Sequence, residues 1–123
     1  MALRVLIVDD DAPFRALIRA LITNGRVKVV GEAADGDEAI RMVEKLSPDI
    51  VLMDVSMPRR DGIEATEEIE TRWPTVRVVI VTGTDTAATW KRLDAREYIR
   101  KSSADLAGEL SLALKTPYIN RRK

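Results

Sequence analysis

The sequence predicts an α/β fold in which a doubly wound parallel sheet carries helices on both faces. Short apolar runs rich in valine and isoleucine alternate five times with segments whose apolar residues recur at helical spacing. These runs are mostly apolar rather than strictly alternating, as expected of strands that are buried on both faces. Such alternation favours right-handed crossovers, and ligands of these sheets bind beyond the carboxyl ends of the strands.

The first strand and helix are predicted from the N-terminal residues. The run from Leu3 to Val8 is apolar and stops at an acidic triplet. Pro13 suits the first turn of a helix, and Asn24-Gly25 supplies its stop. The apolar residues at helical spacing are Phe14, Leu17, Ile18, Leu21 and Ile22.

The second strand is predicted over Val27 to Val30. The sequence Asp35-Gly36-Asp37-Glu38 is typical of a capped helix start, and Ser47-Pro48 ends that helix. The residues that this helix should bury are Ala39, Met42 or Val43, and Leu46.

The third strand, Ile50 to Met53, also ends on an acid, Asp54. A loop then leads to Asp61-Gly62, and the third helix should stop at Pro74. The residues that it should present to the core are Ile63, Thr66, Ile69 and Trp73.

The fourth strand is predicted over Val76 to Val81, with Thr82 at its end. A brief apolar piece at Tyr98 and Ile99 supplies the fifth strand, and Ser102 or Ser103 should open the last helix. The apolar residues of that helix are Leu106, Leu110 and Leu114.

Length and composition limit the classes of function. With 123 residues we expect one domain, over residues 1–116, followed by a tail or linker stub at 117–123. The 20 basic and 20 acidic residues balance, so nothing draws the chain to nucleic acid or a membrane surface, and a protein partner is expected. The chain lacks cysteine and histidine, so any metal must be held by oxygen. No apolar stretch approaches the roughly 20 residues of a membrane span, and we expect a cytoplasmic location.

Five polar residues fall at or just past predicted strand ends: Asp9, Asp10, Asp54, Thr82 and Lys101. One edge of the sheet should therefore collect them. Carboxylates brought together repel one another, and a small cation that prefers oxygen, of which Mg²⁺ is the natural choice, relieves the repulsion. A cation beside a free carboxylate and a lysine also suits phosphoryl transfer, with Asp54 as the nucleophile.

Each of these residues also has a plainer interpretation. An acidic triplet after a strand is often a turn that caps the next helix, and a lysine such as Lys101 is more often a surface charge. Tyr98 could be a partly buried strand aromatic. Their order along the chain, each residue type at its own strand end, favours function over these alternatives.

These residues resemble the response regulator receiver domains of two-component signalling, typified by the chemotaxis response regulator. The segment LIVDD matches the family's acid pair, and Asp54, Met57 and Pro58 match its phosphoacceptor motif, D-x-x-M-P. Thr82 in VVIVTG and Lys101 in YIRK match its hydroxyl and lysine positions. The resemblance implies a flavodoxin-like fold with strand order 2-1-3-4-5.

The resemblance also implies a Mg²⁺ site and a phosphoryl acceptor. Asp10, Asp54 and the main-chain carbonyl of Ser56 would hold Mg²⁺, with Asp9 assisting through water. Asp54 would take phosphate from a sensor kinase's phosphohistidine and later lose it to water. The domain would then be no enzyme toward other substrates, since it would catalyse only its own phosphorylation and dephosphorylation.

By the same resemblance, Thr82 and Lys101 would bind the phosphoryl oxygens and Tyr98 would be the aromatic switch. The stretch from Thr82 to Tyr98 is shorter than is usual in the family, so the fourth helix should be short or irregular. The implied partners are a sensor histidine kinase or phosphotransfer protein, and a downstream protein or C-terminal output domain. A homodimer would use the face of the fourth helix, fifth strand and fifth helix.

Two other classes of function remain open at this point. The triplet Asp9-Asp10-Asp11 also resembles the D-x-D motif of haloacid-dehalogenase-type phosphatases, whose nucleophile would be Asp9. Pro13 departs from that motif, and the motif leaves Asp54 and the residues after it unexplained. The second alternative is a binding module that keeps the receiver fold without phosphorylation.

Overall fold

The computed structural model describes residues 2–55, 57, 59–83 and 97–115 of the chain. Within them, five parallel strands form one sheet in the order β2-β1-β3-β4-β5. The strands are β1 (Leu3–Val8), β2 (Val27–Ala33), β3 (Ile50–Met53), β4 (Arg77–Thr82) and β5 (Tyr98–Arg100). The predicted parallel sheet and its strand order are confirmed.

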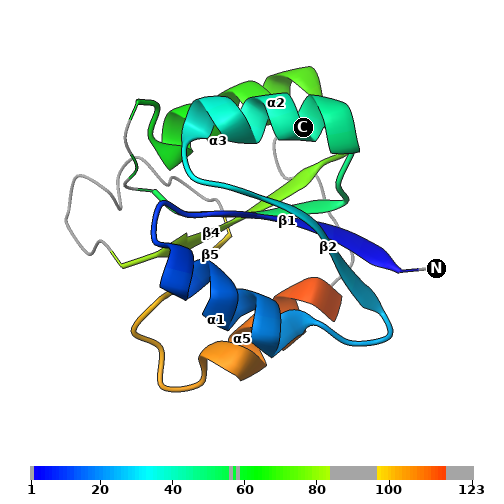
Figure 1. Ribbon diagram of the computed structural model, residues 1–123, viewed down its shortest axis with the longest axis vertical. Coiled ribbons are helices and arrows are strands. Elements are labelled where there is room, and N and C mark those ends of the chain that lie inside the picture. The colour runs from blue at the N-terminus through cyan, green and yellow to red at the C-terminus, as the bar shows by residue number, and fades with distance from the viewer. Residues whose placement is uncertain (1, 56, 58, 84–96, 116–123) are drawn as a thin grey trace.

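Helices cover both faces of the sheet (Figure 1). The helices α2 (Gly36–Leu46) and α3 (Gly62–Arg72) lie together on one face, and α1 (Ala12–Ile22) and α5 (Leu106–Lys115) lie on the other. The short or irregular fourth helix expected from the sequence falls within residues 84–96, outside the described residues. None of the described helices is both long enough and apolar enough to cross a bilayer.

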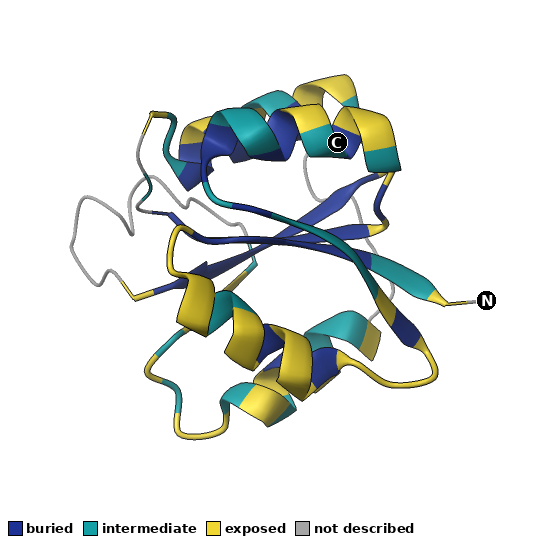
Figure 2. Ribbon diagram, in the orientation of Figure 1, coloured by how far each residue is buried: buried dark blue, intermediate teal, exposed yellow. Residues whose placement is uncertain are grey.

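Alternate strand residues supply two apolar cores, one under each helical layer. Buried residues run along the central strands between the two layers (Figure 2). On β1, Leu6 and Val8 pack in the core beneath α2 and α3, whereas Val5 and Ile7 pack in the core beneath α1 and α5. All four residues of β3 are buried. Burial on both faces explains why β3 is apolar throughout, whereas the edge strands β2 and β5 carry exposed residues such as Lys28 and Arg100.

The structure corrects the bounds of three predicted elements. The second strand continues three residues beyond Val30, because the residues after a bulge still pair with the end of β1, as Val8 does with Ala33. The fourth strand is shifted by one residue, so that Thr82 belongs to it. The last helix begins at Leu106 rather than at a serine, since the Asp105 carboxylate accepts a hydrogen bond from a backbone N–H of its first turn.

The predicted apolar face of the first helix is only partly buried. Ile18 and Ile22 are buried against the sheet, whereas Leu17 and Leu21 are 46% and 39% exposed. All four residues recur at helical spacing, but only Ile18 and Ile22 point straight at the strands.

An ion pair between the buried Arg77 and the partly exposed Glu97 links the start of β4 to the start of β5 and to α5. Arg77 is 3% exposed, and its Nε donates to Glu97 at 2.8 Å, while a second guanidinium nitrogen pairs with the other oxygen of the same carboxylate. A further donor of Arg77 reaches the carbonyl oxygen of Ala113 at 2.6 Å. A planar guanidinium satisfies a carboxylate and a carbonyl at once, which a lysine could not do in this geometry.

We predict that Glu97→Gln lowers the free energy of unfolding by about 2 kcal/mol, because it removes the charge that balances the buried guanidinium. Urea unfolding at neutral pH measures this loss. The matched control is Glu44→Gln, which removes the carboxylate of an exposed ion pair with Arg72 and should change stability little. Equal effects of the two substitutions would contradict this account of Arg77.

Candidate functional site

The parallel pairing of β1 and β3 brings three aspartates together. Val8 pairs with Met53 at the last position of both strands, so the residues that follow leave the sheet at the same level. The backbone N–H of Asp54 donates to the Val8 carbonyl oxygen at 2.9 Å. One carboxylate oxygen each from Asp9, Asp10 and Asp54 lies within 4.8 Å of the others. Asp9 and Asp54 are buried, and Asp10 is exposed.

The third aspartate of the acidic triplet serves a different purpose. The Asp11 carboxylate caps α1 by accepting from the backbone N–H of Phe14 at 3.4 Å. The Asp11 backbone N–H in turn donates to a carboxylate oxygen of Asp9 at 2.9 Å. The helix-capping interpretation therefore holds for Asp11, while Asp9 and Asp10 join the cluster.

The start of α3 holds the backbone around Asp54. Asp61 caps this helix by accepting from the backbone N–H groups of Ile63 and Glu64. The N–H of Gly62 donates to the Val55 carbonyl oxygen at 2.7 Å, and a Cβ on Gly62 would lie 1.7 Å from the Asp54 carbonyl oxygen. Only glycine allows the helix to approach this closely.

Lys101 enters the cluster from the end of β5. Its backbone N–H donates to the Thr82 carbonyl oxygen at 2.8 Å, which fixes where the side chain begins. The ammonium lies 2.6 Å from an oxygen of Asp9 and 3.5 Å from an oxygen of Asp54. It also lies 4.4 Å from the centroid of the Phe14 ring. The sequence placed Lys101 at a strand end, and the structure places its charge between two acids.

Burial raises the pKa of the Asp54 carboxyl from its ordinary 3.8 to about 6, and the nearby charge of Asp9 adds to this effect. The charge of Lys101 opposes the rise. Burial would lower the pKa of Lys101, but the hydrogen bond to Asp9 and the charge of Asp54 outweigh it and raise that pKa. At neutral pH, Asp54 is therefore mostly ionised and Lys101 is charged.

The donor set fits a hard divalent cation. It consists of three carboxylates and lacks nitrogen and sulfur, which favours Mg²⁺ or a similar ion that is bound by oxygen. Three ionised carboxylates and the Lys101 ammonium leave a surplus of negative charge, which a divalent cation would balance. Among the described residues, the Asp10 carboxylate is exposed, so it can contact water or an incoming ligand.

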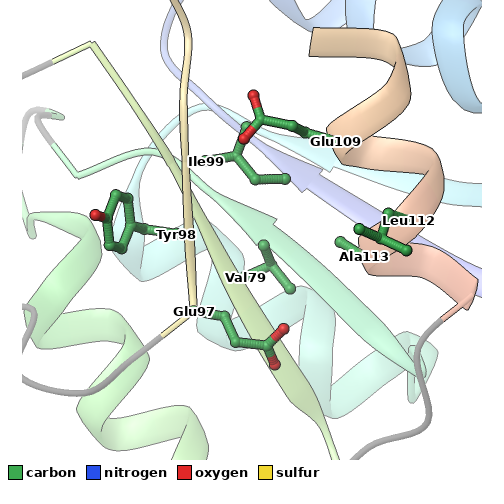
Figure 3. A pocket seen from close by; sticks show the side chains of 7 residues that line it. All are labelled: Val79, Glu97, Tyr98, Ile99, Glu109, Leu112 and Ala113. Carbon is green, nitrogen blue, oxygen red and sulfur yellow. The ribbon is translucent and has the colours of Figure 1, made fainter. Parts of the chain in front are cut away.

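The remaining predicted site residues stand in different positions. Thr82 is buried at the end of β4. Ser56 lies outside the described residues. Tyr98 is 44% exposed and contributes to a pocket between β5 and α5, not to the acidic cluster (Figure 3). Its ring points away from α5, on the opposite side of β5 from Ile99.

Two residues at the site could not be identified from the sequence. Phe14 contacts the Lys101 ammonium, and Arg15 donates to the Asp9 main-chain carbonyl oxygen at 2.6 Å and to Glu32 at 2.8 Å. Both follow the acid pair by about one helical turn. This spacing is the one feature of the sequence that could have identified them as site residues, and ordinary helix residues have the same spacing.

Residues 5–110 match the profile of the response regulator receiver domain. A protein-glutamate methylesterase/protein-glutamine glutaminase from Alkalilimnicola ehrlichii is 39% identical over 115 residues, covering 89% of this chain and 30% of that protein. The chemotaxis protein CheY of Thermotoga maritima is 42% identical over 80 residues, covering 65% of this chain and 67% of that protein. This chain thus spans about a third or less of the length of the methylesterase relatives.

A solved structure gives the same result. The crystal structure of the response regulator domain of Thermotoga maritima CheB superposes with a TM-score of 0.80 at 35% identity, and the match covers 93% of this chain and 94% of that one. The shared fold extends over both helical layers and the strand ends that carry the acidic cluster.

We predict that Asp54→Asn raises the free energy of unfolding when divalent cations are absent, and raises it more as pH increases. The pKa of Asp54 in the folded protein, about 6, exceeds its ordinary 3.8, so the wild type loses stability as pH rises through 6. Asparagine does not ionise and escapes this loss, which is at most about 3 kcal/mol. Urea unfolding with a chelator, across acid to neutral pH, measures the difference between the two proteins. A difference that stays constant with pH would contradict the assignment.

Proposed function

The chain belongs to the response regulator receiver domain family, and on this premise we propose that Asp54 accepts a phosphoryl group with Mg²⁺ held beside it. The observation that carries the proposal is the convergence of Asp9, Asp10 and Asp54 on the Lys101 ammonium at one edge of the sheet. Phosphoryl transfer needs positioned charge more than acid-base chemistry, and this cluster offers both signs of charge within a few ångströms.

Asp54 is the proposed nucleophile because Asp9, the other acid beside Lys101, is already closely paired with the ammonium. Lys101 lies 2.6 Å from Asp9 but 3.5 Å from Asp54, which leaves an oxygen of Asp54 for attack. That oxygen forms a bond to phosphorus as the phosphorus–nitrogen bond of a kinase phosphohistidine breaks. The imidazole leaves with the bonding electrons and takes its proton from solvent. Water later attacks the acyl phosphate and releases inorganic phosphate.

The other residues of the cluster would bind the cation and stabilise the charge of the phosphoryl group. Asp10 and Asp54 would hold Mg²⁺ together with the Ser56 main-chain carbonyl, and Asp9 would assist through water. When bound, the ion would help to neutralise the charge of the phosphoryl oxygens. Lys101 contributes a charge-assisted hydrogen bond to a phosphoryl oxygen.

Signalling follows from a change in the population of two states. We infer that the Thr82 hydroxyl moves toward the phosphoryl group and that Tyr98 fills the space vacated, which changes the surface near β5. Tyr98 is 44% exposed in the structure, so an inward movement of its ring would change the surface near β5. Moving the equilibrium from mostly off to mostly on requires about 5.5 kcal/mol of differential stabilisation, within reach of several charge-assisted contacts.

The biological setting belongs to the same proposal. Within this proposal, residues 1–116 are the receiver domain, residues 117–123 are a C-terminal tail or linker stub, and the protein acts in the cytoplasm. The phosphoryl donor is a sensor histidine kinase or phosphotransfer protein, and the recipient of the signal is a downstream protein or an output domain. The relatives that carry a receiver domain within a much longer chain support this arrangement.

Intact-mass measurement after incubation with acetyl phosphate tests the proposal. The wild type should gain one phosphoryl group with Mg²⁺ and none with chelator, and Asp54→Asn should gain none in either condition. Asp11→Asn is the matched control, because Asp11 caps α1 and asparagine caps helices equally well; this variant should keep its uptake. If the folded wild type gains no mass, the receiver fold serves as a non-phosphorylating binding module instead.

A further inference from the structure

An aromatic ring lies against the Lys101 ammonium, which pairs with the acidic cluster. The Lys101 nitrogen lies 4.4 Å from the centroid of the Phe14 ring, within the range of a cation–π interaction. The Lys101 side chain is 21% exposed, and Phe14 is partly buried. Phe14 is the single phenylalanine of the chain. The proposed phosphoryl transfer has so far assigned it no role.

We propose that Phe14 is a positioning residue for Lys101, holding its ammonium between Asp9 and Asp54 so that it is in place when the phosphoryl group arrives. This inference rests on the function proposed above. If Phe14 has this role, α1 affects the rate of phosphoryl transfer although it supplies no ligand of the cluster.

The charges alone do not hold Lys101 midway between the two acids. Its ammonium is already 2.6 Å from Asp9 and 3.5 Å from Asp54, so pairing with Asp9 draws it away from the acceptor. A neutral ring attracts the ammonium without competing as a counterion and without repelling an incoming phosphoryl group. The ring also restricts a long side chain whose ordering would otherwise cost conformational entropy at the time of reaction.

Local structure fixes the ring at the site. The Asp11 carboxylate accepts from the Phe14 backbone N–H, which places Phe14 in the first turn of α1. The next residue, Arg15, anchors that turn to the end of β1 by donating to the Asp9 carbonyl oxygen at 2.6 Å. The ring and the strand end that carries the acids therefore form one unit, and Lys101 approaches it from β5.

Rates of phosphorylation by acetyl phosphate test the proposal. Phe14→Leu keeps an apolar side chain but removes the ring, and it should slow uptake about three- to tenfold, as expected for one partly buried cation–π contact. Phe14→Tyr keeps the ring and should react at nearly the wild-type rate. Leu17→Ala is the control for a change on the exposed side of the same helix, and it should have no effect.

A double-mutant cycle separates positioning from packing. In a Lys101→Met background, whose slow residual uptake is followed over longer times, Phe14→Leu should cause no further loss. An equal loss in both backgrounds would mean that the ring only packs, and the proposal would fail. Unfolding midpoints of all variants check that the fold is intact.

A second readout does not depend on phosphorylation. In the unphosphorylated protein, the ring should shift the NMR signals of the Lys101 ε-methylene protons upfield, and the shift should vanish in Phe14→Leu and persist in Phe14→Tyr. Absence of the shift in the wild type would overturn the proposal even if uptake is normal. Its presence in a protein that takes up no phosphoryl group would uphold the contact while the proposed function fails.

Discussion

The repulsion among three carboxylates at the carboxyl ends of β1 and β3 is the constraint on which the rest of the site depends. The parallel register sets their separation, because Val8 and Met53 pair as the last residues of their strands. Burial of Asp54 makes the repulsion expensive and raises its pKa to about 6. The protein offsets part of this cost with the charge of Lys101, and a divalent cation would offset the remainder.

The surrounding elements keep the charged groups where this balance holds. Gly62 lets α3 begin against the Asp54 backbone, and Arg15 fastens the end of β1 to α1. At the opposite end of the sheet, the ion pair of the buried Arg77 with Glu97 attaches the start of β5, the strand that delivers Lys101, to β4. Charges that are held in this way need little rearrangement when a phosphoryl group arrives, which is the main contribution a protein makes to this chemistry.

Most of the fold and the acidic residues could be predicted, because apolar runs and the residues that end them are local features of sequence. Contacts between segments that are distant in the sequence could not be predicted. The 4.4 Å approach of Lys101 to Phe14 depends on how α1 is rotated on the sheet, which periodicity alone leaves open for a helix whose apolar residues cover more than one face. The start of α5 was misplaced at a serine because Asp105, the residue that caps it, is one of several capping types in the same short stretch.

The identity of the phosphorylated residue tests the central claim most directly. Reduction of the acyl phosphate with borohydride converts the modified aspartate to homoserine, which peptide mass spectrometry locates in the sequence. After loading with acetyl phosphate and Mg²⁺, the account predicts homoserine at position 54 alone. Homoserine at position 9 would contradict it and would support the phosphatase-like alternative, in which Asp9 is the nucleophile.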